Sequence, residues 1–314
     1  MKVSVCLATY NGEKYIEKQL LSILEQTCTV DEIVITDDCS TDNTLLIIDK
    51  IRNNCKDIKW LIVKNDIRLG FCHNFIKSIG LSTGDYVFLS DQDDIWEPNK
   101  VSDMVSLMDH NKDIDLLFSS YRCIDKNDTI IDFKYRVTNN LLFNLKSYLF
   151  KLIKYPYTSF VKSMNIAGMS MCIRRNCLDN FYKLDLSNIK YHDLFLALFA
   201  SINDGLYFYN KELVNYRMHD DNTIGLNNAI GIKDDRIDWL KNNIDNQIMM
   251  KEYIDTNNLV DKFDCIKRVI NFNSNRLVYL SKKCLFGLLG SIRYLVEYSS
   301  ILSFFGDLKY IIGS

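Results

Sequence analysis

Residues 3–24 read VSVCLATYNGEKYIEKQLLSIL, and this stretch decides the class of fold. Its first part places apolar side chains at Val3, Val5 and Leu7, and this alternation is the period of a β-strand. Its second part, from Tyr15 to Leu24, repeats apolar side chains at intervals of three and four residues. Such spacing gathers them on one face of a helix. The stretch therefore predicts a strand followed directly by an amphipathic helix.

The same alternation of strand and helix continues to about residue 89. Further strands are predicted at 33–35, 60–63 and 86–89, with helices between them at 45–51 and 71–79. Four strands separated by helices indicate parallel βαβ units and a three-layer α/β fold. Because ligands bind beyond the carboxyl ends of parallel strands, we expect a functional site along that edge.

Length and composition limit the class of protein. The chain has 314 residues, of which 47% are hydrophobic and 25% charged, so it is a globular protein of about two domains. The net charge of -2 gives no sign of a nucleic-acid partner. Ten scattered cysteines without a C-x-x-C pair indicate a reducing cytosol, and neither a disulfide framework nor a zinc site. Met1 and Lys2 lead directly into the first strand, so we expect no targeting segment and a cytoplasmic protein.

Polar clusters stand at three of the predicted strand ends: Thr9-Tyr10-Asn11, Asp37-Asp38 and Asp91-Gln92-Asp93-Asp94. For any one cluster, turn formation or helix capping is the commoner explanation, but three clusters on one edge favour a site. The glycines form no phosphate-binding loop, so a bound nucleoside diphosphate would need a metal or basic side chains. Asp91 and Asp93 alternate on an extended segment, so both carboxylates could reach one Mg²⁺ or Mn²⁺ ion.

The middle of the chain offers three further candidates. Gly168 stands at the head of a predicted strand, 167–173, where a backbone could approach a ligand closely. Asp193 precedes an apolar helix, 194–202, and is either a helix cap or a functional acid. His219 follows two short strands predicted near residues 207 and 214, and is either a surface histidine or a metal ligand. Strands at 116–119 and 129–133 and a helix at 141–153 are also predicted.

Several motifs occur in the order found in one known family. They are Ser4 to Asn11, Thr36 to Asp42, Leu89 to Trp96, and His192-Asp193. Over about residues 1–225 the chain resembles the inverting family 2 glycosyltransferases of GT-A fold. The D-Q-D-D-I-W form, together with H-D and Y-R-x-H, most resembles the bacterial rhamnosyltransferase-like branch of capsule and O-antigen synthesis.

The resemblance implies a role for each matching residue. Asp193 falls on the catalytic base, and Gly168 and His192 are assigned to the acceptor side. Asp91 and Asp93 fall on the D-x-D motif that carries metal and ribose contacts, and His219 would complete the shell of a Mg²⁺ or Mn²⁺ ion. The residues assigned to the nucleotide sugar are Thr9, Tyr10, Asn11, Asp38 and Asp91.

The implied activity moves a sugar, with inversion, from a dTDP- or UDP-linked donor to a saccharide or lipid-linked acceptor. Two other enzyme classes use carboxylate-held metal on α/β sheets, the nucleotidyltransferases and the phosphohydrolases. Both classes fit less well, because the chain lacks the glycine-rich N-terminal loop of the first and the early D-x-D of the second. The alternatives are a non-catalytic sugar-nucleotide-binding partner within a synthase complex and a nucleotidyltransferase.

Residues 226–314 are expected to form a separate C-terminal helical region. Residues 261–314 contain eight basic and four acidic side chains, and their apolar side chains recur at helical spacing. The basic excess favours a helical surface that lies on the inner face of the cytoplasmic membrane. The alternative is a set of helices that packs on the catalytic domain or forms a homodimer.

Overall fold

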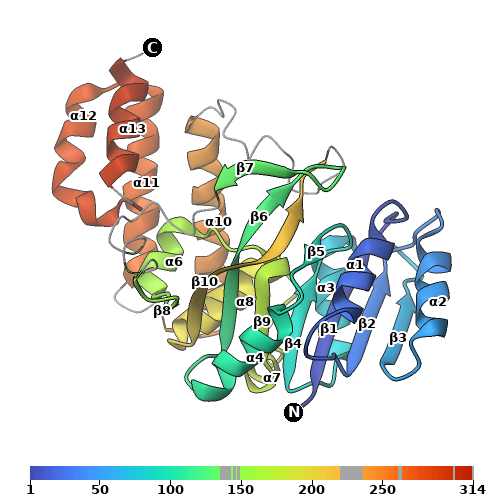
Figure 1. Cartoon of the computed structure of the whole chain (residues 1–314). Coiled ribbons are helices and arrows are strands. Elements are labelled where there is room, and N and C mark those ends of the chain that lie inside the picture. Colours follow the sequence, from blue (N-terminus) through green and yellow to red (C-terminus); the bar gives the residue numbers. More distant parts are fainter. Residues whose placement is uncertain are drawn as a thin grey trace.

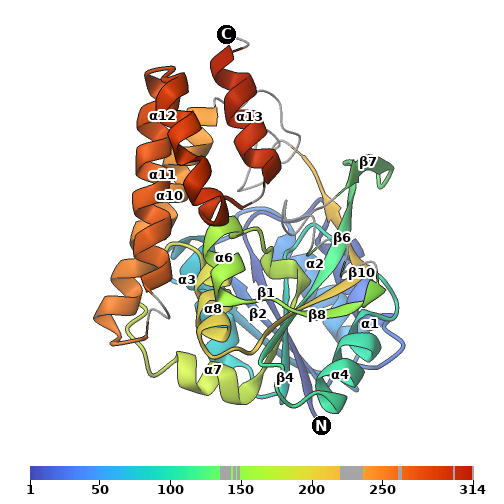
Figure 2. The ribbon, with the colours of Figure 1, turned by 90° about the vertical axis from the view of Figure 1, so that its left-hand side faces the viewer.

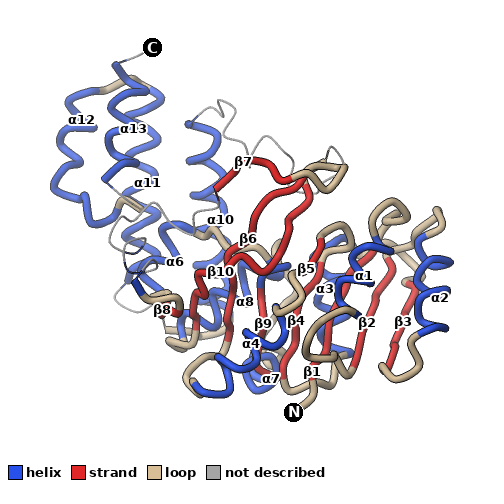
Figure 3. Tube along the Cα trace, in the orientation of Figure 1, coloured by secondary structure: helices blue, strands red, loops and turns tan. Residues whose placement is uncertain are grey.

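The computed structural model describes residues 1–134, 143, 146, 149–219, 236–260, 264–299 and 301–312. The strands are β1 (Val3–Thr9), β2 (Glu32–Asp37), β3 (Lys59–Lys64), β4 (Tyr86–Ser90), β5 (Ile95–Trp96), β6 (Leu116–Ile124), β7 (Ile130–Lys134), β8 (Leu152–Lys154), β9 (Met171–Arg174) and β10 (Leu206–Arg217). The helices before the C-terminal region are α1 (Ile16–Leu24), α2 (Thr44–Asn54), α3 (Gly70–Leu81), α4 (Lys100–His110), α6 (Tyr157–Ser163), α7 (Arg175–Phe181) and α8 (His192–Ile202), with the 3-10 turn η1 (Gly168–Ser170). Figures 1 and 3 show their arrangement.

One sheet runs through the molecule in the order β3-β2-β1-β4-β9-β6-β10-β5, with β7 paired to β6 and β8 to β10. The first four strands in this order are parallel throughout. Strand β9 then runs antiparallel between β4 and β6. The parallel register places Thr9 beside Asp37. The ends of β1 and β2 therefore meet at one edge, as the sequence predicts.

Helices cover both faces of this sheet, which confirms the three-layer arrangement. Alternate residues of a strand point to opposite faces, so Val5 and Cys6 belong to different cores. The core of Val5 lies against α1, α2 and α4. The core of Cys6 lies against α3, α6, α7 and α8.

The structure corrects three local expectations. Residues 207 and 214 belong to one strand, β10, whose pairing with β6 shifts register near Glu212. Gly168 lies in the 3-10 turn η1, and the strand that follows begins only at Met171. Residues 152–154 form strand β8, so the helix predicted over 141–153 does not reach its expected end. The predicted domain boundary at 225/226 lies outside the described residues.

The C-terminal region consists of α10 (Arg236–Thr256), α11 (Cys265–Ser281), α12 (Leu285–Gly290), η3 (Ser291–Glu297) and α13 (Ile301–Ile312). One part of α10 and α11 packs on the core that contains Cys6, through Met250, Tyr253, Ile266 and Val269. The other part forms a separate cluster with α12 and α13 (Figure 2). The searched, described helices include none that is long and apolar enough to cross a membrane.

A buried carboxylate holds this separate cluster together. Asp307 of α13 has no exposed surface and forms ion pairs with Arg276 of α11 and Arg236 of α10. Its Oδ1 atom accepts a hydrogen bond from Nη2 of Arg276 at 2.9 Å, and the hydroxyl of Tyr298 donates to its Oδ2 atom at 3.1 Å. One residue therefore joins three helices.

We predict that Asp307→Asn destabilises the C-terminal helices. Removing one charge of a buried ion pair leaves the guanidinium groups uncompensated, and the expected loss is about 3–5 kcal/mol. Urea unfolding followed by circular dichroism measures the change. Asp238→Asn is the control, because Asp238 pairs with Lys241 at an exposed position and its loss should cost about 0–1 kcal/mol. Equal stability of the two variants would contradict the role given to Asp307.

Candidate active site

The ends of β1 and β2 are tied together by buried hydrogen bonds. Oγ1 of Thr9 donates to Oδ2 of Asp37 at 2.9 Å, and the backbone N–H of Ser40 donates to Oδ1 of Asp37 at 2.9 Å. Thr9 and Asp37 are both buried. Their side chains therefore shape the edge of the sheet from within.

Tyr10 links this edge to the loop that follows β4, residues 91–94, which is called the acidic loop below. Its backbone N–H donates to Oε1 of Gln92 at 2.9 Å, and Nε2 of Gln92 donates back to its carbonyl oxygen at 3.0 Å. A Cβ atom on Gly12 would lie 2.3 Å from the same Oε1 atom, so only glycine leaves room for Gln92. The partly exposed Tyr10 ring carries the guanidinium of Arg68, 3.8 Å from its centroid.

Asn11 and Asp38 bind neighbouring backbone. The side-chain oxygen of Asn11 accepts a hydrogen bond from the N–H of Thr41 at 2.9 Å. Asp38 accepts hydrogen bonds from the N–H groups of Leu69 at 2.6 Å and Gly70 at 2.9 Å. Asp38 therefore caps the first turn of α3. Their assignment to the nucleotide stays a prediction.

The acidic loop crowds three carboxylates, of which Asp94 is buried and Asp91 and Asp93 are half-buried. Burial, and then the charges of Asp93 and Asp193, raise the pKa of Asp91 to about 7. Asp94 is fully buried, and burial followed by repulsion from Asp93 and Asp91 raises its pKa well above the usual range. Three aspartates of one loop and Asp193 of α8 thus act on one another electrostatically.

Two buried cations lie against this loop. Lys100 of α4 has no exposed surface, and burial lowers its pKa to about 7, while Asp94 and Asp91 oppose this change. Its Nζ atom donates to the carbonyl oxygen of Met169 at 2.6 Å and lies 3.6 Å from the ring centroid of Trp96. Lys100 therefore connects the acidic loop with turn η1.

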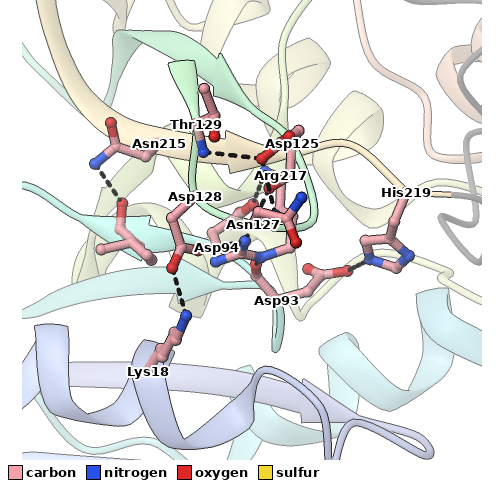
Figure 4. Close-up of polar contacts among 11 residues, drawn as sticks. Lys18, Asp93, Asp94, Asp125, Asn127, Asp128, Thr129, Asn215, Arg217 and His219 are labelled. Atoms are coloured by element: carbon pink, nitrogen blue, oxygen red, sulfur yellow. Dashed lines mark hydrogen bonds and ion pairs between the residues drawn. The ribbon is translucent and has the colours of Figure 1, made fainter. Parts of the chain in front are cut away.

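Arg217, the second buried cation, stands at the end of β10 (Figure 4). Its backbone N–H donates to Oδ1 of Asp94 at 3.0 Å, and its Nε atom donates to the carbonyl oxygen of Asp93 at 2.7 Å. The same guanidinium donates to the carbonyl oxygen of Asp125 at 3.0 Å and pairs with Asp128. Arg217 thus fixes both the acidic loop and the turn between β6 and β7.

His219 lies in contact with Asp93, as the metal hypothesis requires. Its Nε2 atom is 2.9 Å from Oδ2 of Asp93, and Figure 4 shows the two side chains pointing at each other. The ring also packs against Tyr15, with 5.0 Å between centroids. The contact brings together residues 126 positions apart, and their role as metal ligands stays a prediction.

Asp193, His192 and Gly168 are also neighbours. Asp193 lies in the first turn of α8, and its Oδ1 atom accepts a hydrogen bond from the N–H of Leu194 at 2.8 Å. A Cβ atom on Gly168 would lie 3.1 Å from Nε2 of His192 and 3.4 Å from Cβ of Asp193. His192 is buried and stacks on Phe75, with 4.1 Å between centroids. Within the described structure neither of its ring nitrogens has a hydrogen-bond partner.

Three residues of this site were not singled out from the sequence. Lys100 reads as an ordinary position in the first turn of a helix, and Gln92 as the variable residue of a D-x-D motif. Arg217 belongs to the quoted Y-R-x-H segment, and this segment was the available signal. Lys100 could not be found, because its contacts with Met169 and Trp96 depend on the packing of α4 against the sheet.

The described residues contain no group of three or more His, Cys, Asp and Glu side chains arranged to hold a metal ion. A cation that serves a nucleotide sugar needs fewer, since Mg²⁺ is held by one or two protein carboxylates together with substrate phosphates. The carboxylate of Asp93 suits Mg²⁺ or Mn²⁺, and the imidazole of His219 beside it favours the transition metal Mn²⁺ of the two. The residues present therefore fit a site that is completed by the substrate.

Comparison with known proteins identifies the family. The profile of glycosyl transferase family 2 matches residues 4–177. A dTDP-rhamnosyl transferase, RfbG of Shigella flexneri, is 31% identical over 246 residues, covering 75% of this chain and 79% of the relative. The chain belongs to glycosyl transferase family 2. It is thus a glycosyltransferase, and the resemblance seen in the sequence is confirmed.

Other relatives and solved structures agree with this family. An abequosyltransferase, RfbV of Salmonella typhimurium, is 36% identical over 134 residues, which is 42% of this chain and 38% of the relative. The structure of TarS 1–349 from S. aureus in complex with UDP-GlcNAc has a TM-score of 0.59 at 16% identity, covering 100% of this chain and 93% of that one. The mannosyltransferase PcManGT of Pyrobaculum calidifontis, in complex with GDP-Man and Mn²⁺, has a TM-score of 0.57 at 17% identity over 99% and 85% of the two chains. These structures confirm the GT-A fold.

We predict that Asp91→Asn stabilises this glycosyltransferase above pH 7 when no divalent cation is present. The folded-state pKa of Asp91, about 7, lies above its ordinary value of 3.8. Stability contributed by the neutral carboxyl is therefore complete below pH 4 and is lost as the pH rises through 7. The variant should melt about 2 °C or more above the wild type at pH 8, a shift that corresponds to ~1 kcal/mol.

Melting curves at pH 5 and pH 8 measure this difference. Asp103→Asn is a matched control, because Asp103 lies in the first turn of α4 and pairs with Lys211 near the surface. A gain in melting temperature for Asp91→Asn that is no larger at pH 8 than at pH 5 would contradict the electrostatic account.

Proposed function

We propose that this glycosyltransferase is a metal-dependent inverting enzyme that moves a hexose, rhamnose being the first candidate, from a nucleoside diphosphate donor to a saccharide or lipid-linked acceptor. The main support is the family membership of the chain, together with the position of Asp193, whose charge adds to burial and to the charge of Asp93 in raising the pKa of Asp91. In this proposal a carboxylate for the acceptor and ligands for the donor share one electrostatic environment. The dTDP-rhamnosyl transferase relative supports a dTDP-linked donor, and UDP is the second candidate.

The donor occupies the edge formed by β1, β2 and the acidic loop in this proposal. The partly exposed ring of Tyr10 and the backbone around Asn11 receive the base and ribose, over a floor built by Thr9 and Asp38. Asp91 binds the ribose and the metal. The cost of keeping Asp91 ionised in a buried place falls when a cation and a ligand neutralise it.

Asp91, Asp93 and His219 would hold a Mg²⁺ or Mn²⁺ ion together with the diphosphate. When bound, such an ion neutralises the negative charge that develops on the leaving diphosphate. Asp93 is oriented for this task by its contact with His219, and the backbone of the loop by Arg217. These side chains thus position the donor before any reaction occurs.

Asp193 acts as the general base. Its carboxylate takes the proton from the acceptor hydroxyl while that oxygen attacks the anomeric carbon, and the bond from this carbon to the diphosphate oxygen breaks on the opposite face. Attack opposite the leaving group inverts the anomeric centre. Gly168 and His192 lie against Asp193 and form the acceptor side.

In this proposal residues 1–225 form the catalytic domain and residues 226–314 a helical domain. The enzyme works in cell-surface polysaccharide synthesis, in the cytoplasm and on the inner face of the membrane, where lipid-linked acceptors are found. Family membership removes the nucleotidyltransferase alternative. A non-catalytic donor-binding role would give tight donor binding without release of nucleoside diphosphate when an acceptor is added.

Asp193→Asn should keep donor binding and lose transfer by a factor of about 10² or more, as expected for a neutralised general base. Asparagine retains an oxygen that can accept the hydrogen bond from the N–H of Leu194, so the helix cap is preserved. Release of nucleoside diphosphate measures transfer, and calorimetry measures donor binding. A variant that unfolds, or one that transfers normally, would show Asp193 to be a cap only.

His219→Ala should weaken donor binding about tenfold or more in the presence of Mn²⁺ and leave binding without metal unchanged, since each lost ligand weakens the cation site. Calorimetric titrations with and without Mn²⁺ separate the two effects. His110→Ala is the control, because His110 is exposed at the end of α4. Equal donor affinity of the wild type with and without Mn²⁺ would overturn the metal assignment. If His219→Ala binds the donor in Mn²⁺ as tightly as the wild type does, only the assignment of His219 as a ligand would be wrong.

A further inference from the structure

The apolar side chains of the C-terminal segment are of two kinds. Leu288, Phe304 and Ile311 face the interior of the helical cluster and are buried. Others on the same elements face solvent, and Phe286 is 87% exposed. The remaining members of this outward set are Leu289, Ile292, Tyr294, Phe305 and Ile312.

The outward side chains follow the helix period. Phe286, Leu289 and Ile292 are three residues apart along α12 and the start of η3, so they lie on one side of that segment. Phe305 and Ile312 are seven residues apart on α13 and share a face with Lys309. Figures 1 and 2 both show α12 and α13 side by side. These residues, 286, 289, 292, 305 and 312, are exposed apolar side chains of the neighbouring elements α12, η3 and α13, and together they are called the outer face below.

The charges of this segment are sorted in the same way. Residues 282–314 contain four basic and two acidic side chains. Lys282, Lys283, Arg293 and Lys309 are all exposed. Asp307 is fully buried in its ion pairs, and Glu297 is 12% exposed and pairs with Lys162 and Arg268. Both acids are thus engaged within the protein, and the exposed charged side chains of residues 282–312 are all basic.

We infer that the outer face binds the surface of a bilayer that contains anionic lipids. Apolar side chains flanked by lysine and arginine are the composition of interfacial helices, which insert their apolar side chains at the boundary of headgroups and acyl chains. The flanking cations are attracted to the negative leaflet. A second copy of the chain fits less well, because a two-fold contact would bring identical positive faces together.

The position of the outer face gives the contact a consequence for catalysis, and this step rests on the proposed function. In Figures 1 and 2, α12 and α13 lie at the end of the molecule opposite the N-terminus, where β1 begins. The carboxyl ends of β1, β2 and β4 point towards that same end. The Asp307 network joins α13 to α10 and α11, and these helices pack on the catalytic core. A bilayer bound by the outer face would lie on the side of the active edge, where a lipid-linked acceptor is presented.

The test is co-sedimentation of the full chain with vesicles, without donor or acceptor. The wild type should bind vesicles of phosphatidylcholine with phosphatidylglycerol, and bind those of phosphatidylcholine alone much less. High salt should weaken binding, because it screens the lysine and arginine charges. The double variant Phe286→Ser, Ile292→Ser should lose about tenfold or more of its partitioning, since two apolar side chains no longer insert.

Leu46→Ser is the matched control, because Leu46 is 68% exposed on α2, far along the sheet order from the C-terminal helices. It should bind vesicles like the wild type. The double variant should also keep the wild-type melting temperature, whereas Leu288→Ser, at a buried position, should lower it. Transfer to a water-soluble acceptor should be unchanged in the double variant. Vesicle binding is measured without donor or acceptor, so its outcome does not depend on the catalytic assignments.

Three outcomes would overturn the inference. The first is a wild type that binds neither kind of vesicle. The second is a folded double variant that partitions like the wild type. The third is a wild type that is a dimer in gel filtration, a double variant that is a monomer, and equal vesicle binding by the two. This result would make the outer face a contact between two copies of the chain.

Discussion

The candidate active site at the carboxyl ends of β1, β2 and β4, called the active edge, depends on a balance between the crowded carboxylates of the acidic loop and two buried cations. Asp91, Asp93 and Asp94 follow β4 within four residues, and burial together with mutual repulsion raises the pKa values of Asp91 and Asp94. Lys100 and Arg217 compensate part of this charge from α4 and β10. Each cation also donates to backbone carbonyl oxygens, Lys100 to Met169 and Arg217 to Asp93 and Asp125. The groups that balance the charge are thus the groups that set the positions of the surrounding loops. A change in one of them would alter both the electrostatics and the geometry of the site.

Under the proposed function, this arrangement would let one end of the sheet serve both substrates. Gln92 joins the acidic loop to the end of β1 on the donor side. Lys100 joins the same loop to turn η1, and Gly168 of that turn lies against Asp193 and His192 on the acceptor side. The residues proposed for the donor and for the acceptor are therefore linked by hydrogen bonds of Gln92 and Lys100, by the charge of Lys100 beside the acidic loop, and by close packing at Gly168. In the proposed mechanism these links would hold the base and the leaving group on opposite sides of the reacting carbon, as inversion requires. The two ring nitrogens of His192, beside Asp193, are among the buried polar atoms that have no hydrogen-bond partner within the described structure.

In the C-terminal region, too, a buried ion pair sets the positions of the surrounding elements. Between residues 282 and 312 the two acids are turned inward, where Asp307 joins α13 to α10 and α11, and the four basic side chains are exposed. A buried ion pair contributes little net stability when compared with apolar packing, but it fixes which helix faces meet. That fixed arrangement leaves Phe286 and its neighbours exposed on a rigid support. The apolar side chains of the region therefore form two groups. One group is buried and packs the helices together, and the other forms the outer face, which is exposed to solvent.

The sequence by itself determined the layered α/β fold and the edge at which the site lies, because strand and helix periods are local properties of the chain. It also determined the family, since the motifs from Ser4 to Asp193 keep their order, and it indicated His219 from the Y-R-x-H segment. Only the tertiary structure decided which of these residues face one another. Thr9 and Asp38 turn towards protein atoms, whereas His219 reaches Asp93 across 126 positions. Lys100 could not be assigned from local patterns, and the Y-R-x-H segment marked Arg217 without its partners, because the carbonyl oxygens that both residues bind come from distant segments. In the same way, hydropathy alone could not separate Leu288 from Phe286, since the packing of α11, α12 and α13 determines which one is buried.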